Sequence, residues 1–124
     1  MAHSSHPLTA ADLTQFTGTS TYYQHWLGIQ YTDGVFFLAE RGGAYWLIDA
    51  IASWQIDPRI RDDQMLQQIQ FWALTVNDNR SAVLSCERDT DDIAVTQTIP
   101  FTDFPLKEIR LYLQRGILLL PAEY

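Results

Sequence analysis

The sequence has little of what usually reveals a function. Its single cysteine, Cys86, allows no internal disulfide, which agrees with a reducing compartment. Uninterrupted apolar runs such as 44–48 and 117–120 fall far short of the ~20 residues that a membrane-spanning helix needs. The N-terminal residues lack the basic and apolar regions of a secretory signal peptide. We therefore expect a soluble, cytoplasmic protein with no membrane partner.

Basic residues are also scarce. Fifteen acidic side chains stand against eight basic ones, which gives a net charge of −7. A surface of this sign repels the phosphates of nucleic acids. The composition therefore predicts no direct binding of DNA or RNA.

Motifs with known chemistry are absent. The sequence has no G-x-S-x-G nucleophile elbow, no Walker phosphate loop, no G-x-G-x-x-G and no H-E-x-x-H. The acidic runs at 57–63 and 87–92 lack the ligand spacing of an EF-hand. His3 and His6 lie in the N-terminal leader, where two ligands make a poor metal site. The sequence thus predicts no cofactor and no metal, and it favours a protein that is not an enzyme.

Apolar and aromatic residues are plentiful. Hydrophobic residues make up 47% of the 124 positions, with four Trp, six Tyr and six Phe. A chain of this length can bury roughly two-thirds of its unfolded surface. No repeat, low-complexity segment or linker divides the sequence. We expect one globular domain over 1–124, in which 1–8 form a flexible leader.

The segment 44–55 predicts the central helix of this domain. Its apolar residues fall on almost every side of a 3.6-residue period, which is typical of a helix buried all round. Trp46 is accordingly expected in the core.

Further helices are predicted on either side of the central one. Thr9 can cap a short helix that runs to residue 16. Asp33 to Arg41 reads as a helix with Thr32 as its N-cap, although Asp33-Gly34 also fits a hairpin turn. A last helix is expected to begin near Leu106 and to stop at Gly116.

In the second half of the chain, apolar residues recur at every second position. This period predicts strands at 69–76, 81–88 and 93–99, joined by polar turns into an antiparallel meander. A short buried strand follows at 117–120. The segment 20–27 fits a strand or a helix, and its aromatic residues favour the strand. The fold class is α+β: an antiparallel three- to four-stranded sheet packed against a central buried helix and two to three further helices.

Asp49 is the most conspicuous polar residue, because it is the only charged residue of the central helix, with Ser53 one turn away. A buried carboxylate must be paired or shifted toward its neutral form. Arg41, Arg61 or His25 could pair with it. We favour a structural ion pair over a catalytic acid. Asp49, His25 and Ser53 remain the candidate catalytic residues, and Cys86, on the inward face of a strand, is expected to be inert.

Five motifs carry a resemblance to known proteins. They are F-T-G-T at 16–19, Y-T-D-G-V at 31–35, A-Y-W-L-I-D at 44–49, T-D-F-P-L at 102–106 and L-L-L-P-A-E-Y at 118–124. With them the chain resembles a family of small bacterial proteins of unknown function, often carried by plasmids and phages. The resemblance implies an association with mobile elements and brings no activity, cofactor or catalytic residue.

These observations favour a small accessory protein that binds another protein through a surface patch. The aromatic content and the apolar C-terminal strand also lead us to expect a homodimer. The alternative is a small enzyme or small-molecule binder, with a pocket against the central helix that uses Asp49 and His25 as polar groups.

Overall fold

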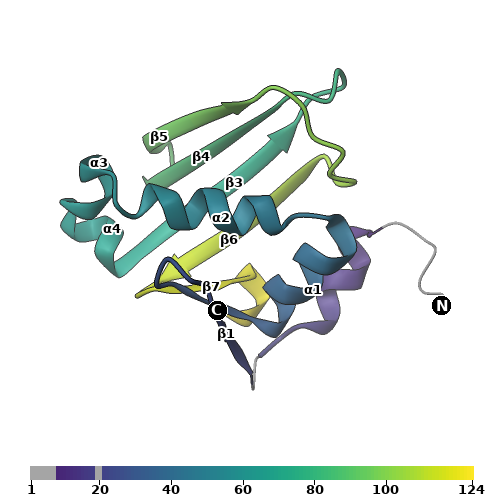
Figure 1. Cartoon of the computed structure of the whole chain (residues 1–124), viewed down its shortest axis with the longest axis horizontal. Coiled ribbons are helices and arrows are strands. Elements are labelled where there is room, and N and C mark those ends of the chain that lie inside the picture. The colour runs from purple at the N-terminus through teal and green to yellow at the C-terminus, as the bar shows by residue number, and fades with distance from the viewer. Residues whose placement is uncertain (1–7, 19–20) are drawn as a thin grey trace.

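The computed structural model describes residues 8–18 and 21–124 and has two layers, a seven-stranded sheet and a set of helices packed on it (Figure 1). The strands are β1 (Tyr22–Gln24), β2 (Gln30–Thr32), β3 (Ile69–Val76), β4 (Ala82–Asp89), β5 (Asp92–Ile99), β6 (Glu108–Gln114) and β7 (Ile117–Leu119). The helices are η1 (Ala10–Gln15), α1 (Asp33–Gly42), α2 (Tyr45–Trp54), α3 (Pro58–Arg61), α4 (Gln64–Gln68) and η2 (Pro121–Glu123), where η marks a 3-10 helix.

The α+β class is confirmed, but the sheet is larger than expected and is mixed. Its order is β1-β2-β7-β6-β3-β4-β5. The expected meander is present as β3, β4 and β5. The pairing of β2 with β7 is parallel, whereas the other five pairings are antiparallel. Strands of three residues are too short to show a two-residue period, so β1 and β2 could not be placed in the sheet from the sequence.

The two faces of the sheet differ. Along β3, Trp72 and Leu74 are buried beneath the helices, while Thr75 on the opposite face is exposed. Figure 1 shows α2 lying across the face formed by β3 and β6. Successive side chains along a strand point to opposite faces of the sheet, so one face forms the core and the other meets solvent.

The predicted last helix is wrong, because β6 occupies that segment. Ile109, Leu111 and Leu113 alternate toward the core, opposite Leu74, Trp72 and Gln70 of β3. Apolar residues at 106, 109 and 113 also satisfy a helical period, so the sequence was ambiguous there. Arg115 and Gly116 have φ of +49° and +84°, as a two-residue type I′ turn requires. That turn joins β6 to β7, and Gly116 therefore closes a hairpin, not a helix.

Helix α1 starts as its capping pattern predicts, and the hairpin reading of Asp33-Gly34 is wrong. The Thr32 hydroxyl accepts a hydrogen bond from the Val35 N–H (3.3 Å), and Gly43 ends the helix at a φ of +61°. The Glu123 carboxylate lies at the same N-terminus. It accepts hydrogen bonds from the Thr32 hydroxyl (2.7 Å) and the Gly34 N–H (3.3 Å). An anion is stabilised there by the helix dipole.

Helix α2 covers the core but is not buried all round, which corrects the expectation for 44–55. Leu47, Ile48, Ile51 and Ala52 are buried. Asp49 and Ser53 are exposed, and Trp46 is only half-buried. Trp46 and Trp54 pack against the edge of the core, and the side of the helix away from the core meets solvent with Tyr45 as its exposed aromatic residue.

The N-terminal part agrees with several further expectations. A short helix, η1, follows Thr9, and β1 lies within 20–27 as the strand reading required. Residues 1–7, which include His3 and His6, lie outside the described residues, and Leu8 is buried. Within 8–18 and 21–124, no helix is long and apolar enough to cross a membrane.

Candidate functional site

The structure brings His25 and Asp49 together. His25 lies in the loop between β1 and β2 and is 7% exposed, whereas the Asp49 side chain projects from α2 and is 60% exposed. Their Nε2 and Oδ1 atoms are 2.7 Å apart. His25 is thus the partner of Asp49 among the three that the sequence offered. The expectation that Asp49 would be buried is wrong, because it sits on the exposed side of α2.

Both ring nitrogens of His25 are engaged. The Leu27 N–H donates to Nδ1 (3.0 Å), so this nitrogen is an acceptor, and the proton of the neutral ring sits on Nε2. Nε2–H therefore donates to Asp49. A general base needs a free nitrogen lone pair within reach of substrate. His25 has none without losing its bond to Leu27, and the pair acts as a link between the β1–β2 loop and α2.

Ser53 does not complete a catalytic group with this pair. Its hydroxyl donates to the backbone carbonyl of Asp49 (2.8 Å), not to the carboxylate. This local bond within the helix is common for exposed Ser and leaves no activated nucleophile. Trp26, which is exposed, stacks on the His25 ring at a centroid distance of 5.7 Å. The three candidate residues therefore lie on one side of α2 without triad geometry.

Cys86 lies in the core beneath the helices. Burial raises the pKa of its thiol to about 12, so the reactive thiolate is scarce at neutral pH. Among the described residues, no three His, Cys, Asp or Glu side chains are grouped to hold a metal ion.

A groove runs between the end of α2 and β5. It has a volume of about 400 Å³ and is lined by Ala50, Ser53, Trp54, Ile56, Asp57 and Gln97. The Trp54 indole N–H donates to the Gln97 side-chain carbonyl (2.8 Å), which ties α2 to β5 along the floor of the groove. Asp49 and His25 do not line it. A hollow does lie against the central helix, but its polar lining residues include Asp57 and Gln97 in place of Asp49 and His25.

Strand β5 is an edge of the sheet, and part of its backbone faces away from β4. The Asn77 N–H donates to the Ser81 carbonyl (2.7 Å), so Ser81 and the odd-numbered residues of β4 direct their backbone hydrogen bonds toward β3. Because the direction alternates along a strand, the even-numbered residues of β4 bond toward β5. Their partners on β5 are Val95, Gln97 and Ile99. The backbone N–H and C=O groups of Thr96 and Thr98 therefore point outward. In the part of the chain that the structure describes, β5 pairs with β4 alone, so no second strand bonds to these groups.

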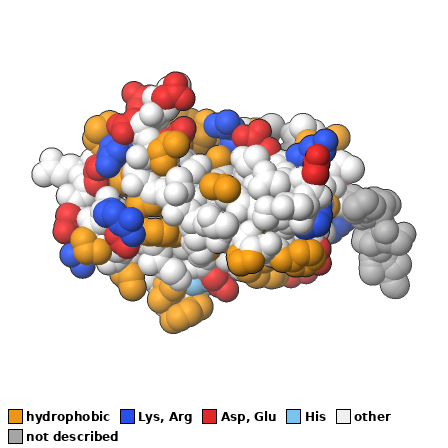
Figure 2. Space-filling model, turned by 90° about the horizontal axis from the view of Figure 1, so that it is seen from above, with side chains coloured by type: hydrophobic (Ala, Val, Ile, Leu, Met, Phe, Trp, Pro, Cys, Tyr) orange, Lys and Arg blue, Asp and Glu red, His pale blue; other side chains and the backbone are white. Residues whose placement is uncertain are grey.

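The chemistry of this edge is unusual for an exposed strand. Residues 93–99, here called the β5 edge, contain no charge and no proline. Natural proteins usually protect such edges with charges, prolines or a covering element. Exposed apolar side chains lie at both ends: Ile93, its first residue, is 54% exposed, and Phe101, just beyond its last residue, is 68% exposed. Figure 2 views the molecule from the β5 side, and charged side chains lie mainly around, not within, the centre of this face.

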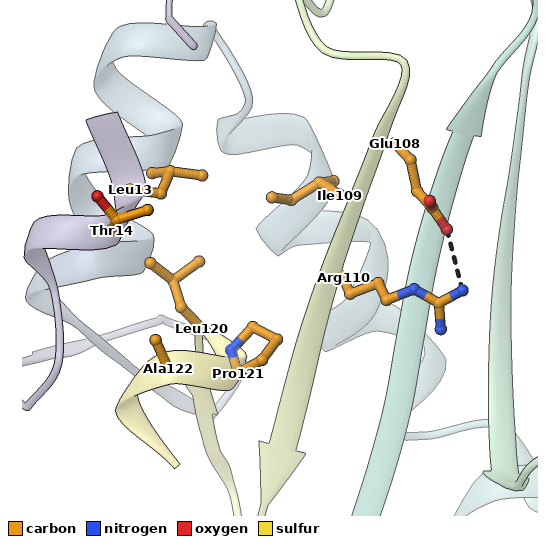
Figure 3. Close-up of a pocket in the computed structure, with 8 residues that line it drawn as sticks. All are labelled: Leu13, Thr14, Glu108, Ile109, Arg110, Leu120, Pro121 and Ala122. Carbon is orange, nitrogen blue, oxygen red and sulfur yellow. Dashed lines mark ion pairs between the residues drawn. The ribbon is translucent and has the colours of Figure 1, made fainter. Parts of the chain in front are cut away.

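A second hollow, of about 280 Å³, lies beside β6 (Figure 3). Beside it, β7 ends at Leu119. In the continued register Leu120 lies opposite Leu111, and the next hydrogen-bonding position falls on Pro121, which has no N–H to donate. In Figure 3 Ile109 points toward Leu13 and Leu120. Glu108 and Arg110 point the other way and form an ion pair (3.1 Å). The wall of this hollow is therefore largely apolar.

A comparison with family models matches residues 7–124, nearly the whole chain, to a family of unknown function, DUF6876. The chain belongs to this family. Neither the curated proteins nor the solved structures contain a significant match to it. Membership in DUF6876 thus agrees with the unknown function that the sequence resemblance implied, and it assigns no activity.

The β5 edge was missed by the sequence reasoning, although a signal was present. Strand 93–99 was expected, and neither it nor 69–76 carries a charged residue, whereas 81–88 carries Glu87 and Arg88. The sequence did not reveal which meander strand would be an edge. That depended on β6, which was expected to be a helix and instead pairs with β3 on the opposite side from β4.

Proposed function

We propose that this DUF6876 chain is a non-enzymatic accessory protein that binds an extended segment of a partner protein as an added strand beside β5. The observation that carries this function is the open β5 edge, with its outward backbone groups at Thr96 and Thr98. Strand addition uses such groups for affinity. An uncharged edge without proline presents no obstacle to it.

The groove beside α2 supplies the second element of such a site. Alternate side chains of an added strand would point to the helix side of the sheet. There they meet the groove lined by Trp54, Ile56 and Gln97. Strand-binding proteins obtain specificity from pockets of this kind, next to the backbone bonds. Backbone pairing and side-chain selection thus lie on the same side of the molecule.

His25 and Asp49 have a structural part in this proposal. Their hydrogen bond holds the β1–β2 loop on α2, and α2 in turn forms one wall of the groove. The association with plasmid or phage genomes, which the sequence resemblance implies, stays a prediction. The cytoplasmic location stays a prediction as well. The absence of direct nucleic-acid binding follows from the net charge of −7 and is likewise a prediction.

Selecting peptides that bind the purified chain from a displayed library of random linear peptides tests this function. We expect binders that shift the backbone amide resonances of Thr96 and Thr98. Thr96→Pro should abolish their binding, because it removes an outward N–H that β4 does not use, and proline is tolerated on a strand edge. Thr96→Ala keeps the N–H and is the matched control. Binders that shift only resonances far from β5, or that bind Thr96→Pro unchanged, would refute the proposal.

A second candidate function is the binding of a small apolar ligand in the hollow beside β6, which its apolar wall favours. The probe is the fluorescent dye anilinonaphthalene sulfonate. Ala122→Phe, which fills the hollow, should remove dye fluorescence if the dye binds there. Equal fluorescence of the variant and the wild type would exclude this site.

A further inference from the structure

The charges around β5 point to a particular kind of partner. A chain with a net charge of −7 attracts basic partners, yet the β5 edge offers no charge for a basic segment to contact. Asp92, at the start of β5, is already paired with Arg88 (2.8 Å), and Arg88 also contacts Asp63 (2.6 Å). Charge therefore does not select a foreign segment here. A strand that is itself uncharged is the matching occupant.

We infer that the β5 edge of one chain pairs antiparallel with the β5 edge of a second copy, so that the two sheets become continuous across a two-fold axis. This inference rests on the proposed function, because it names the partner of the same edge. An isologous interface of this kind uses the same surface on both copies, so that each β5 is the added strand of the other. A segment of another protein would bind the same edge in competition with the second copy.

The backbone geometry selects a register. In an antiparallel pair, residues that exchange two hydrogen bonds alternate with residues that exchange none. With the axis at Gln97, Thr96 of each copy lies opposite Thr98 of the other, and both outward residues of the regular part of β5 are used. A register centred on Thr96 would pair Thr98 with Ala94, where the register of β5 against β4 shifts. The arrangement centred on Gln97 therefore satisfies more backbone groups.

The side chains and the charges fit the same arrangement. Antiparallel pairing brings the Ile93 end of one β5 to the Phe101 end of the other, and both residues are exposed in the single chain. The acidic turns at 87–92 are placed at opposite ends of the joint. The two Asp92 residues lie ten strand positions apart, or roughly 30 Å at ~3.3 Å per residue. That separation exceeds the Debye length of about 8 Å several times, so repulsion between the turns is screened.

Sedimentation equilibrium of the full chain at ~100 μM tests the association. We expect a species of twice the 14.3 kDa chain mass that dissociates on dilution. Thr98→Pro removes one outward N–H from each copy, and the two lost hydrogen bonds should raise the dissociation constant about 30-fold. Thr98→Ala, which keeps the N–H, is the control and should dimerise like the wild type.

Cysteine cross-linking tests the register and does not depend on the proline variant being folded. Gln97→Cys places two thiols at a non-hydrogen-bonded pair, where the Cβ atoms lie ~4.5–5.5 Å apart, close enough for a disulfide after a small adjustment. Mild oxidation should give a covalent dimer. Thr75→Cys, exposed on β3 away from the edge, should not cross-link.

The possible results separate this inference from the proposed function. A wild-type chain that sediments at 14.3 kDa at ~100 μM overturns the dimer, and peptides that still bind at Thr96 and Thr98 would leave the proposed function standing. A dimer with an unchanged dissociation constant in folded Thr98→Pro, or one that cross-links at Thr75→Cys as readily as at Gln97→Cys, also overturns it, because either result places the interface elsewhere.

Discussion

A buried amide network beneath α2 allows a quantitative prediction. Gln70 on β3 is 2% exposed, and all four of its hydrogen-bonding positions are used. Its Oε1 accepts from Gln55 Nε2 (2.9 Å) and from Trp72 Nε1 (2.8 Å). Its Nε2 donates to Gln55 Oε1 (2.7 Å) and to the Leu66 carbonyl (3.0 Å). One side chain therefore joins the end of α2, α4 and β3.

Gln70→Leu keeps most of the volume and removes these bonds. Gln55 is only half-buried and can turn to water, but the indole N–H of Trp72 and the Leu66 carbonyl are left unpaired in the core. Each buried polar group that loses its hydrogen bond lowers stability by about 1–3 kcal/mol, and the buried apolar surface of the new leucine raises stability by about 1 kcal/mol. We expect the free energy of unfolding to fall by about 2–4 kcal/mol. That is a large part of the ~5–15 kcal/mol expected for such a domain.

A double-mutant cycle measured by urea denaturation checks this reasoning. Trp72→Phe removes the indole N–H and should cost about 1–2 kcal/mol, mainly through lost volume. In Gln70→Leu/Trp72→Phe, the orphan N–H is gone. The combined loss should therefore be about 1–2 kcal/mol smaller than the sum of the single losses. Losses that add within ~0.5 kcal/mol would show that the Trp72 N–H contributes nothing to the cost of losing Gln70.

Four further predictions concern single groups. Asp49→Asn should lower stability by only about 0.5–1 kcal/mol in thermal melts, because the carboxylate is largely exposed; a melting temperature above wild type would instead indicate strain at a functional site. Arg88 lowers the pKa of Asp63 in the folded chain. The stability that this pair contributes is therefore present above the unfolded pKa of ~3.9 and is lost as the pH falls through the lower folded pKa. Asp63→Asn should make the melting temperature depend less on pH in this acid range, and an unchanged dependence would contradict the prediction. Cys86 should react with a thiol reagent at pH 8 only as fast as the chain unfolds, and rapid labelling of the folded chain would contradict its burial. Glu123→Ala should cost about 1–3 kcal/mol in urea unfolding, unlike Glu123→Gln, which still accepts a hydrogen bond at α1.

The sequence predicted those elements whose own residues determine them. The strands at 69–76, 81–88 and 93–99 follow from a two-residue period that no helix would share. Helix α1 follows from Thr32 before it and Gly43 after it, which satisfy the two ends locally. These features need no knowledge of the rest of the fold.

The remaining features depend on contacts between distant segments. Residues 106–113 fit both periods, and pairing with β3 and β7 decided for a strand. The bond from His25 to Asp49 was one of three pairings the sequence allowed, and the position of the β1–β2 loop selected it. Gln70 carried no signal at all, because a polar residue within a strand usually faces solvent. Its burial follows from Gln55 and Trp72 lying within reach.

The place of the β6–β7 hairpin in the sheet has a consequence for synthesis of the chain. In the strand order, β1–β2 and β3–β4–β5 are joined only through β7 and β6, whose residues 108–119 leave the ribosome after all the other strands. Until then the nascent chain holds two separate groups of strands, and β2 and β3 each present an unpaired edge. Unpaired edges are templates for pairing with other chains. The interval before residue 119 emerges is therefore the stage at which this protein is most exposed to aggregation and has most to gain from a chaperone.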